Sequence, residues 1–228
     1  AGVLLVTGIG LFSGLTVRPA HADGKAGPAA KEAAKSVDSA GKSSAVASSP
    51  SKMIGQRIDD FELLATDGTQ WTLSAQSAKV VVVTFNGVEC PLANLYLARL
   101  NELREKWKPD EVQFVSINAN EQDTLQQVRD QSQRLNLKLL QLKDAGNRVA
   151  DQFQANRTPE TFVLDAERVV RYQGRIDDQY GYSVKRAAPA QQELVSAIEA
   201  VLAGRSPDVV TTTVQGCIIG RQRTPRAN

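Results

Sequence analysis

The chain has 228 residues, of which 42% are hydrophobic and 23% charged, enough for one well-buried domain with sizeable tails. Its 27 basic and 25 acidic side chains nearly cancel, to a formal net charge of +2, so we expect no nucleic-acid partner. Two cysteines exclude a disulfide-rich scaffold and a four-cysteine zinc site. Removal of the single histidine, His21, with a leader would leave no imidazole for catalysis or metal binding, so we expect no metal site.

Residues 1–22 have the pattern of a secretory signal peptide. Residues 1–17 carry no charge and are mainly apolar, and the small-x-small triplet Ala20-His21-Ala22 precedes Asp23. Neither an initiating Met nor a basic segment comes first, so we expect a longer gene product. Cleavage after Ala22 predicts an exported protein, periplasmic or otherwise extracytoplasmic; the alternative is an uncleaved segment that tethers the protein to a membrane.

Residues 23–52 consist almost entirely of Ala, Gly, Ser, Lys and Pro, without an aromatic residue. Such a composition cannot fill a core, so it predicts a disordered linker. The pattern changes at Met53, and we expect a folded domain over residues 53–203. Residues 204–228 are then a C-terminal tail that carries Cys217.

The folded domain begins with a predicted β-hairpin over residues 61–73, followed by a buried strand, a helix and a second buried strand. The two buried strands flank one helix, so we expect them to be parallel. A polar helix, a short segment, a further helix, a second hairpin and a last helix follow. The sheet should therefore be mixed, with helices on both faces. After the first hairpin, we expect strands over residues 79–85 and 112–117 and a second hairpin over 161–165 and 168–173. The expected helices span residues 91–107, 121–136, 146–155 and 189–203, and the short segment spans 138–142.

Cys90 stands where the strand that ends at Phe85 passes into the helix that begins near Pro91. Proline is favourable at the first helical position, and the positive end of the helix dipole stabilises a thiolate there. Glu89 opposes this effect because it adds a negative charge beside the sulfur. We expect a moderately activated, reachable thiol, and the alternative is a buried structural cysteine.

Cys-Pro at a helix start, with Thr158-Pro159 leading into a strand, resembles the thioredoxin fold. Within it, the chain resembles the redoxin and peroxiredoxin-like branch, the alkyl hydroperoxide reductase and thiol-specific antioxidant superfamily. Further matches are Phe61, Trp71 and the stretch 170–178. The resemblance implies an α/β three-layer sandwich with a central mixed sheet and an N-terminal β-hairpin extension. It also implies a cis Thr158–Pro159 bond next to Cys90, and no cofactor.

The resemblance further implies that Thr158 backbone groups bind an extended thiol or peptide substrate, with Pro159, Pro91 and Glu89 beside it. From the residues alone, Pro159 is either a simple loop terminator, which is the commoner case, or a cis-proline, which is rarer. Arg157 either stabilises a thiolate or a peroxide oxygen, or pairs with Glu160 or Asp151.

Two departures from the family pattern weaken two of its chemistries. Ala93 replaces the second cysteine of a CxxC pair, so no local disulfide can form. Gly87 stands where typical peroxiredoxins place the Thr or Ser whose hydroxyl orients the peroxide. The first departure argues against a thioredoxin-like exchange reaction and the second against a typical peroxidase.

Cys217, in the tail, either resolves an oxidised Cys90, forms a static bond with it, or is a spare thiol for a partner. The surrounding residues 216–221 resemble segments where exported redoxin domains continue into c-type cytochrome modules, but no CxxCH motif is present. We expect an exported thiol oxidoreductase that uses Cys90 on a small peroxide or a protein thiol or disulfide, with an external thiol reductant. The competing hypothesis is a non-enzymatic docking domain of a larger electron-transfer protein.

Overall fold

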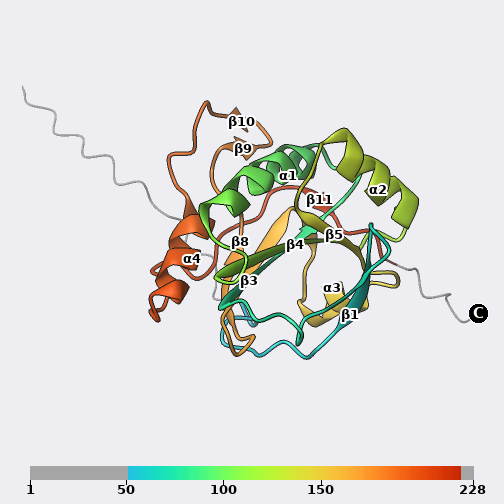
Figure 1. Cartoon of the computed structure of the whole chain (residues 1–228). Coiled ribbons are helices and arrows are strands. Elements are labelled where there is room, and N and C mark those ends of the chain that lie inside the picture. Colours follow the sequence, from blue (N-terminus) through green and yellow to red (C-terminus); the bar gives the residue numbers. More distant parts are fainter. Residues whose placement is uncertain (1–50, 222–228) are drawn as a thin grey trace, which may run out of the picture. The chain divides into compact units, whose positions relative to one another are not determined.

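The centre of the structure is a mixed sheet of seven strands in the order β2-β1-β5-β4-β3-β7-β8 (Figure 1). The computed structural model describes residues 51–221. The predicted signal peptide and residues 23–50 of the predicted linker lie outside the described residues. The strands are β1 (Glu62–Ala65), β2 (Gln70–Thr72), β3 (Val80–Asn86), β4 (Val112–Asn118), β5 (Leu140–Lys143), β7 (Glu160–Leu164) and β8 (Val170–Gly174).

The pairing confirms the predicted mixed sheet. Strand β4 runs parallel to both β3 and β5, whereas β7 is antiparallel to β3 and β8 is antiparallel to β7. The N-terminal hairpin of β1 and β2 pairs antiparallel with β5 and so extends the sheet at that edge. The carboxyl ends of β3 and β4 therefore lie together, and the loops that leave them can form a site.

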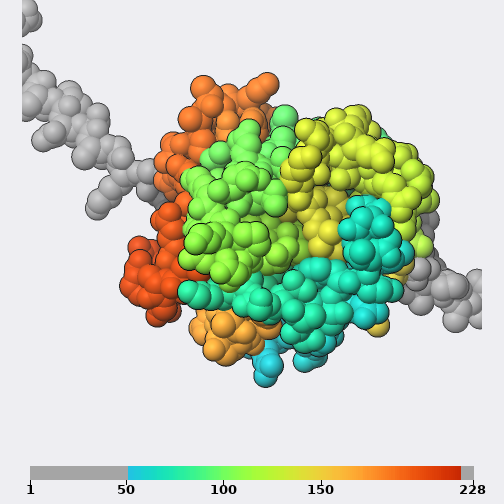
Figure 2. All heavy atoms as spheres, in the orientation of Figure 1, coloured from blue at the N-terminus to red at the C-terminus, as the bar shows by residue number. Residues whose placement is uncertain are grey.

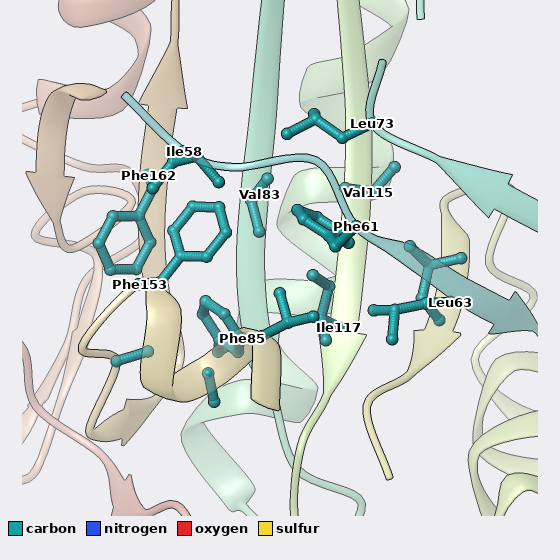
Figure 3. Close-up of a cluster of buried hydrophobic side chains, with 14 of the residues drawn as sticks. Ile58, Phe61, Leu63, Leu73, Val83, Phe85, Val115, Ile117, Phe153 and Phe162 are labelled. Carbon is teal, nitrogen blue, oxygen red and sulfur yellow. The ribbon is translucent and has the colours of Figure 1, made fainter. Parts of the chain in front are cut away.

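Alternate residues of β3 belong to two separate hydrophobic clusters because successive side chains point to opposite faces. Val83 and Phe85 pack with Phe153, near the end of α3, and with the segment before β1 (Figure 3). On the other face, Val80 and Val82 pack against α1 and α4. The helices are α1 (Pro91–Leu103), continued by the 3₁₀ turn η1 (Arg104–Lys106), then α2 (Leu125–Arg134), α3 (Arg148–Gln152) and α4 (Glu193–Leu202).

Within the described residues, four two-residue strands lie outside the main sheet. Strands β9 (Tyr180–Gly181) and β10 (Val184–Lys185) form a small hairpin, and β6 (Arg157–Thr158) pairs with β11 (Cys217–Ile218). The β9–β10 hairpin, orange in Figure 2, lies against α1, where the Tyr96 and Tyr180 rings contact edge to face. The sequence predicted none of these strands.

Residues 207–221, which we call the C-terminal strap, are packed onto the domain. The Gln173 N–H of β8 donates to the Val210 carbonyl at 3.0 Å, and the Ile219 N–H donates to the Asn156 carbonyl at 3.0 Å. Ile219 is 2% exposed and joins the cluster that contains Phe153. Burial of this side chain extends the packed structure past residue 203, where the sequence suggested that the domain ends. Within residues 51–221, no helix has the length and apolar character needed to cross a bilayer.

Candidate functional site

Cys90 is the N-cap residue of α1. Its backbone is extended (φ −81°, ψ 112°), and Pro91 occupies the first turn of the helix. The Cys90 N–H donates to the Gly87 carbonyl at 3.3 Å, which closes the turn between β3 and α1. The Cys90 thiol donates to the Thr158 carbonyl, with 3.0 Å between sulfur and oxygen. This contact joins the start of α1 to β6.

Cys90 is only 3% exposed, which corrects the expectation of a reachable thiol. The two hydrophobic clusters of the domain do not include it. Its neighbours are instead the Thr158 carbonyl and Cys217, which the strap places over it. The strap, through Cys217, is therefore part of what buries the thiol.

Cys217 reaches Cys90 because β11 pairs with β6. The two strands are antiparallel, with Cys217 opposite Thr158 and Ile218 opposite Arg157. The thiol and the backbone N–H of Cys217 both act to lower the pKa of Cys90, which places them beside its sulfur. Both cysteines are free thiols, and Cys217 is exposed. The structure thus brings together the two cysteines whose pairing the sequence left open.

The two thiols have pKa values shifted in opposite directions. Burial acts to raise the pKa of Cys90, but the Thr158 hydroxyl, the backbone N–H of Ala93 and the thiol and N–H of Cys217 outweigh it, and the pKa is lowered. Burial, and then the neighbouring Cys90, raises the pKa of Cys217 to about 11. Cys90 is therefore the thiol that ionises first.

Gly216 allows the strap to approach β6 this closely. Its φ is +146°, and a Cβ atom added there would lie 1.9 Å from the Thr158 carbonyl oxygen. No side chain fits into that space, so the residue before Cys217 must be glycine for this pairing to form.

The space above Gly87 is filled by side chains from elsewhere. A Cβ added at Gly87 would lie 2.5 Å from Asn120 Nδ2 and 3.4 Å from Thr158 Oγ1. The Thr158 hydroxyl is buried and has no hydrogen-bonded oxygen or nitrogen among residues 51–221. A hydroxyl therefore lies beside Cys90 although position 87 carries none.

The Arg157 side chain contacts the strap and does not contact Cys90 in the hydrogen bonds of the described residues. Its Nη1 donates to the Gly216 carbonyl at 2.7 Å and to the Tyr182 hydroxyl at 3.4 Å. Its positive charge acts to lower the pKa of Cys217. In the described part of the chain its guanidinium forms no ion pair with Glu160 or Asp151; Asp151 pairs with Arg221. The charge thus lies beside Cys217.

The remaining expected substrate residues surround the same place. Glu89 and Pro91 are exposed at the start of α1. The Thr158–Pro159 bond is cis, and Pro159 lines a pocket of about 170 Å³ with Tyr96 and residues of the β9–β10 hairpin. The Thr158 backbone, expected to bind an extended substrate, is already paired with Cys217. Among residues 51–221, no group of three His, Cys, Asp or Glu side chains is placed to hold a metal ion.

A sequence model of the AhpC/TSA family matches residues 54–173, more than half of the chain. The chain belongs to the AhpC/TSA family. The match includes Cys90, Arg157 and the Thr158–Pro159 pair, and it ends before Cys217. Membership confirms the resemblance stated from the sequence. The matched residues do not include the strap, so the family match says nothing about the role of Cys217.

Solved structures show the same fold. A hypothetical protein from Sinorhizobium meliloti 1021 is 28% identical, with a TM-score of 0.70 over 77% of this chain and 98% of that one. An uncharacterised conserved protein from Geobacillus kaustophilus is 24% identical, with a TM-score of 0.67 over 76% and 94%. Peroxidoxin BcpB from Mycobacterium tuberculosis is 19% identical, with a TM-score of 0.50 over 67% and 97%. No curated protein matches the chain.

Sequence reasoning missed the polar residues that support the candidate site. Asn120 and Asp123 follow β4 and are buried near the loop that carries Cys90. Tyr182 donates its hydroxyl to the Gly216 carbonyl at 2.8 Å. The sequence did contain one signal of this packing. Gly216 and Gly220 flank the Cys217 segment, and glycine is favoured where one backbone approaches another closely.

Proposed function

We propose that the protein is a thiol oxidoreductase that reduces a hydroperoxide, with Cys90 as the nucleophile and Cys217 as the resolving cysteine. The observation that carries this proposal is that both cysteines meet at Thr158, because Cys217 pairs with Thr158 across β11 and β6 and the Cys90 thiol donates to the Thr158 carbonyl at 3.0 Å. The opposite pKa shifts assign the roles, because the thiolate is the reactive form and Cys90 ionises first.

The proposed reaction has two steps. The Cys90 thiolate attacks one oxygen of the hydroperoxide, a sulfur–oxygen bond forms, and the oxygen–oxygen bond breaks. The leaving oxygen takes a proton and departs as an alcohol or water, and Cys90 becomes a sulfenic acid. The Cys217 sulfur then attacks the Cys90 sulfur, and the sulfur–oxygen bond breaks. The hydroxide that leaves takes the Cys217 proton, which yields water and a Cys90–Cys217 disulfide.

The first step also changes the properties of Cys217. Part of its raised pKa comes from the neighbouring Cys90. A sulfenic acid is uncharged near neutral pH, so its formation removes the repulsion between two thiolates. Arg157 remains beside Cys217 and favours its ionised form. Cys217 is therefore activated after Cys90 has been oxidised.

Exposure of Cys217 supports a second candidate function, thiol–disulfide exchange with a protein thiol or disulfide. In the oxidised pair, the Cys217 sulfur would be open to attack by an incoming thiolate, which would regenerate Cys90 as the leaving group. The same attack by an external thiol reductant leaves a mixed disulfide on Cys217, and a second external thiol then attacks the outer sulfur, releases Cys217 as a thiol and completes the peroxidase cycle. A two-electron balance follows, since two external thiols become one disulfide.

Stopped-flow mixing with hydrogen peroxide tests the proposal. We expect Cys90 to react far faster than free cysteine at the same pH, and intact mass spectrometry to show loss of two hydrogens from the wild type. Cys217→Ser should accumulate a sulfenic acid that dimedone traps, and Cys90→Ser should do neither. A Cys90 thiol no faster than free cysteine in the wild type would support the docking domain of a larger electron-transfer protein instead.

We also propose that this chemistry takes place outside the cytoplasm. The support is the pattern of residues 1–22, which predicts export, and an associated c-type cytochrome module would be a partner there. Fractionation of cells that express the full-length gene product tests the location. Recovery of the protein with cytoplasmic enzymes would contradict it.

A further inference from the structure

A buried pair of polar side chains, Asn120 and Asp123, connects the two segments that carry the cysteines. We propose that this pair sets the approach of Cys217 to Cys90, so that both are positioning residues for formation of the disulfide. The inference rests on the proposed function only in taking Cys90 and Cys217 as a redox pair. We call Asn120 and Asp123 the polar bridge.

On the Cys90 side, the bridge holds the turn before α1. Asp123 Oδ2 accepts hydrogen bonds from the Val88 N–H at 3.0 Å and from Asn118 Nδ2 at 2.7 Å. Val88 lies two residues before Cys90. Asp123 is 2% exposed, and hydrogen bonds to a buried carboxylate are stronger than those between neutral groups. The carboxylate therefore fixes the backbone that carries the nucleophile.

On the Cys217 side, the bridge holds the strap. Asn120 Oδ1 accepts a hydrogen bond from the Gly220 N–H at 2.9 Å, and the Gly220 carbonyl accepts one from the Glu121 N–H at 2.9 Å. Asn147 Nδ2 also donates to that carbonyl, at 3.1 Å. Gly220 lies three residues after Cys217. The strap is thus fixed directly beyond its cysteine.

One hydrogen bond joins the two sides. Asn120 Nδ2 donates to Asp123 Oδ2 at 3.0 Å, so a continuous path runs from the Val88 N–H through both side chains to the Gly220 N–H. Asn120 is 5% exposed, and its amide fills the space that a side chain at Gly87 would need. The bridge therefore relates one cysteine segment to the other, besides holding each in place.

Such a link should raise the effective concentration of one thiol at the other. A restrained pair pays less conformational entropy when the bond forms than a pair on two independently moving segments. The relevant equilibrium is the exchange of the reduced protein with oxidised glutathione, which yields the Cys90–Cys217 disulfide and two reduced glutathione molecules. A bridge that merely stabilised the fold would leave this equilibrium unchanged.

The test compares Asn120→Ala and Asp123→Ala with Thr124→Ala in the full chain. Thr124 caps α2 with its side chain and, within residues 51–221, forms its side-chain hydrogen bonds with Gln127 and none with either cysteine segment, so its loss weakens the fold without breaking the bridge. We expect both bridge variants to lower the glutathione equilibrium constant by about tenfold, the effect of one hydrogen bond to a charged group. Thr124→Ala should leave the constant unchanged.

Amide hydrogen exchange gives a second readout. Asp123→Ala should speed exchange at Val88 and, through Asn120, at Gly220, whereas Thr124→Ala should change neither. If Asp123→Ala does not fold, Asp123→Asn replaces it; the amide keeps one acceptor but loses the charge, and the same changes should be smaller.

An unchanged equilibrium constant in both bridge variants would overturn the inference, as would a wild type that forms no disulfide with oxidised glutathione. Neither measurement uses peroxide. If the wild type forms the disulfide with oxidised glutathione but does not react with peroxide, the proposed peroxidase function is refuted. The inference about the bridge would then still stand or fall on the glutathione equilibrium constants of its variants.

Discussion

The buried hydroxyl of Thr158 is the side-chain group that most directly favours the Cys90 thiolate. It is the largest of the influences that lower the pKa of Cys90, and its oxygen has no competing oxygen or nitrogen partner in the described structure. Thr158→Val keeps the shape and removes the donor. We expect the pKa of Cys90 to rise and the rate with hydrogen peroxide at neutral pH to fall by about tenfold.

Thr158→Ser is the matched control, because it keeps the hydroxyl and should stay near the wild-type rate. Ultraviolet absorbance of the thiolate against pH measures the pKa, and stopped-flow mixing measures the rate. Equal thiolate titrations in Thr158→Val and the wild type would show that the hydroxyl has no part in ionisation.

The two thiols should ionise in two separate steps. The pKa of Cys90 is lowered below its ordinary value, and that of Cys217 is raised to about 11. As pH rises, thiolate absorbance should therefore increase first below the range of an ordinary cysteine and again near pH 11. Cys217→Ser should lose the upper step, and Cys90→Ser should move the remaining step downward, because Cys90 is one cause of the raised value. A single step at the ordinary cysteine pKa would contradict these assignments.

Gly216 is the residue whose replacement should separate the strap from β6. An alanine there would combine an unfavourable φ of +146° with a Cβ atom 1.9 Å from the Thr158 oxygen. We expect Gly216→Ala to lower the free energy of unfolding by about 2 kcal/mol and to speed alkylation of Cys90. Gly204→Ala is the control, since Gly204 also has a positive φ (+68°) but nothing within 4 Å. It should lose stability in urea unfolding without exposing Cys90.

At the scale of elements, periodicity predicted the long strands and helices but not the short ones. The β-branched run before Phe85 became β3, and the helical spacing after Cys90 became α1, although the α-helix ends at Leu103 and a 3₁₀ turn follows. Strands β6 and β11 have two residues each and carry no repeating pattern. They exist only because a distant segment pairs with them, which local sequence cannot show.

Within the strap, two adjacent isoleucines test which contacts hold it. Ile219 is 2% exposed, whereas Ile218 is 73% exposed. Ile219→Ala should lower the free energy of unfolding by up to about 3 kcal/mol. It should also speed alkylation of Cys90, because it removes packing that keeps the strap docked. Ile218→Ala should change neither quantity. Urea unfolding and timed iodoacetamide labelling measure the two effects, and equal labelling in both variants would show that Ile219 does not hold the strap.

At the scale of the whole molecule, the site is assembled from segments far apart in the chain. Cys90 could be predicted because its helix start, its proline and the family pattern are all local. Cys217 could be named only as a candidate, since its partner depends on how the strap crosses β6. Asn120 and Asp123 could not be identified, because isolated polar residues after a strand are common and only their burial between the two segments gives them meaning.

The strap also couples the redox state to the stability of the whole domain. A Cys90–Cys217 bond closes a loop that contains most of the domain, and loops of that length constrain the unfolded chain by about 5 kcal/mol in the chain-entropy description. We expect the oxidised protein to unfold at a clearly higher temperature than the reduced protein, and Cys217→Ser to unfold at one temperature in both conditions. The full difference in unfolding temperature is expected only if the disulfide forms without displacing the strap from its folded position. Differential scanning calorimetry of both forms measures it. An oxidised form no more stable than the reduced one would mean that bond formation pulls the strap away from β6, and the close approach at Gly216 would then belong to the reduced state alone.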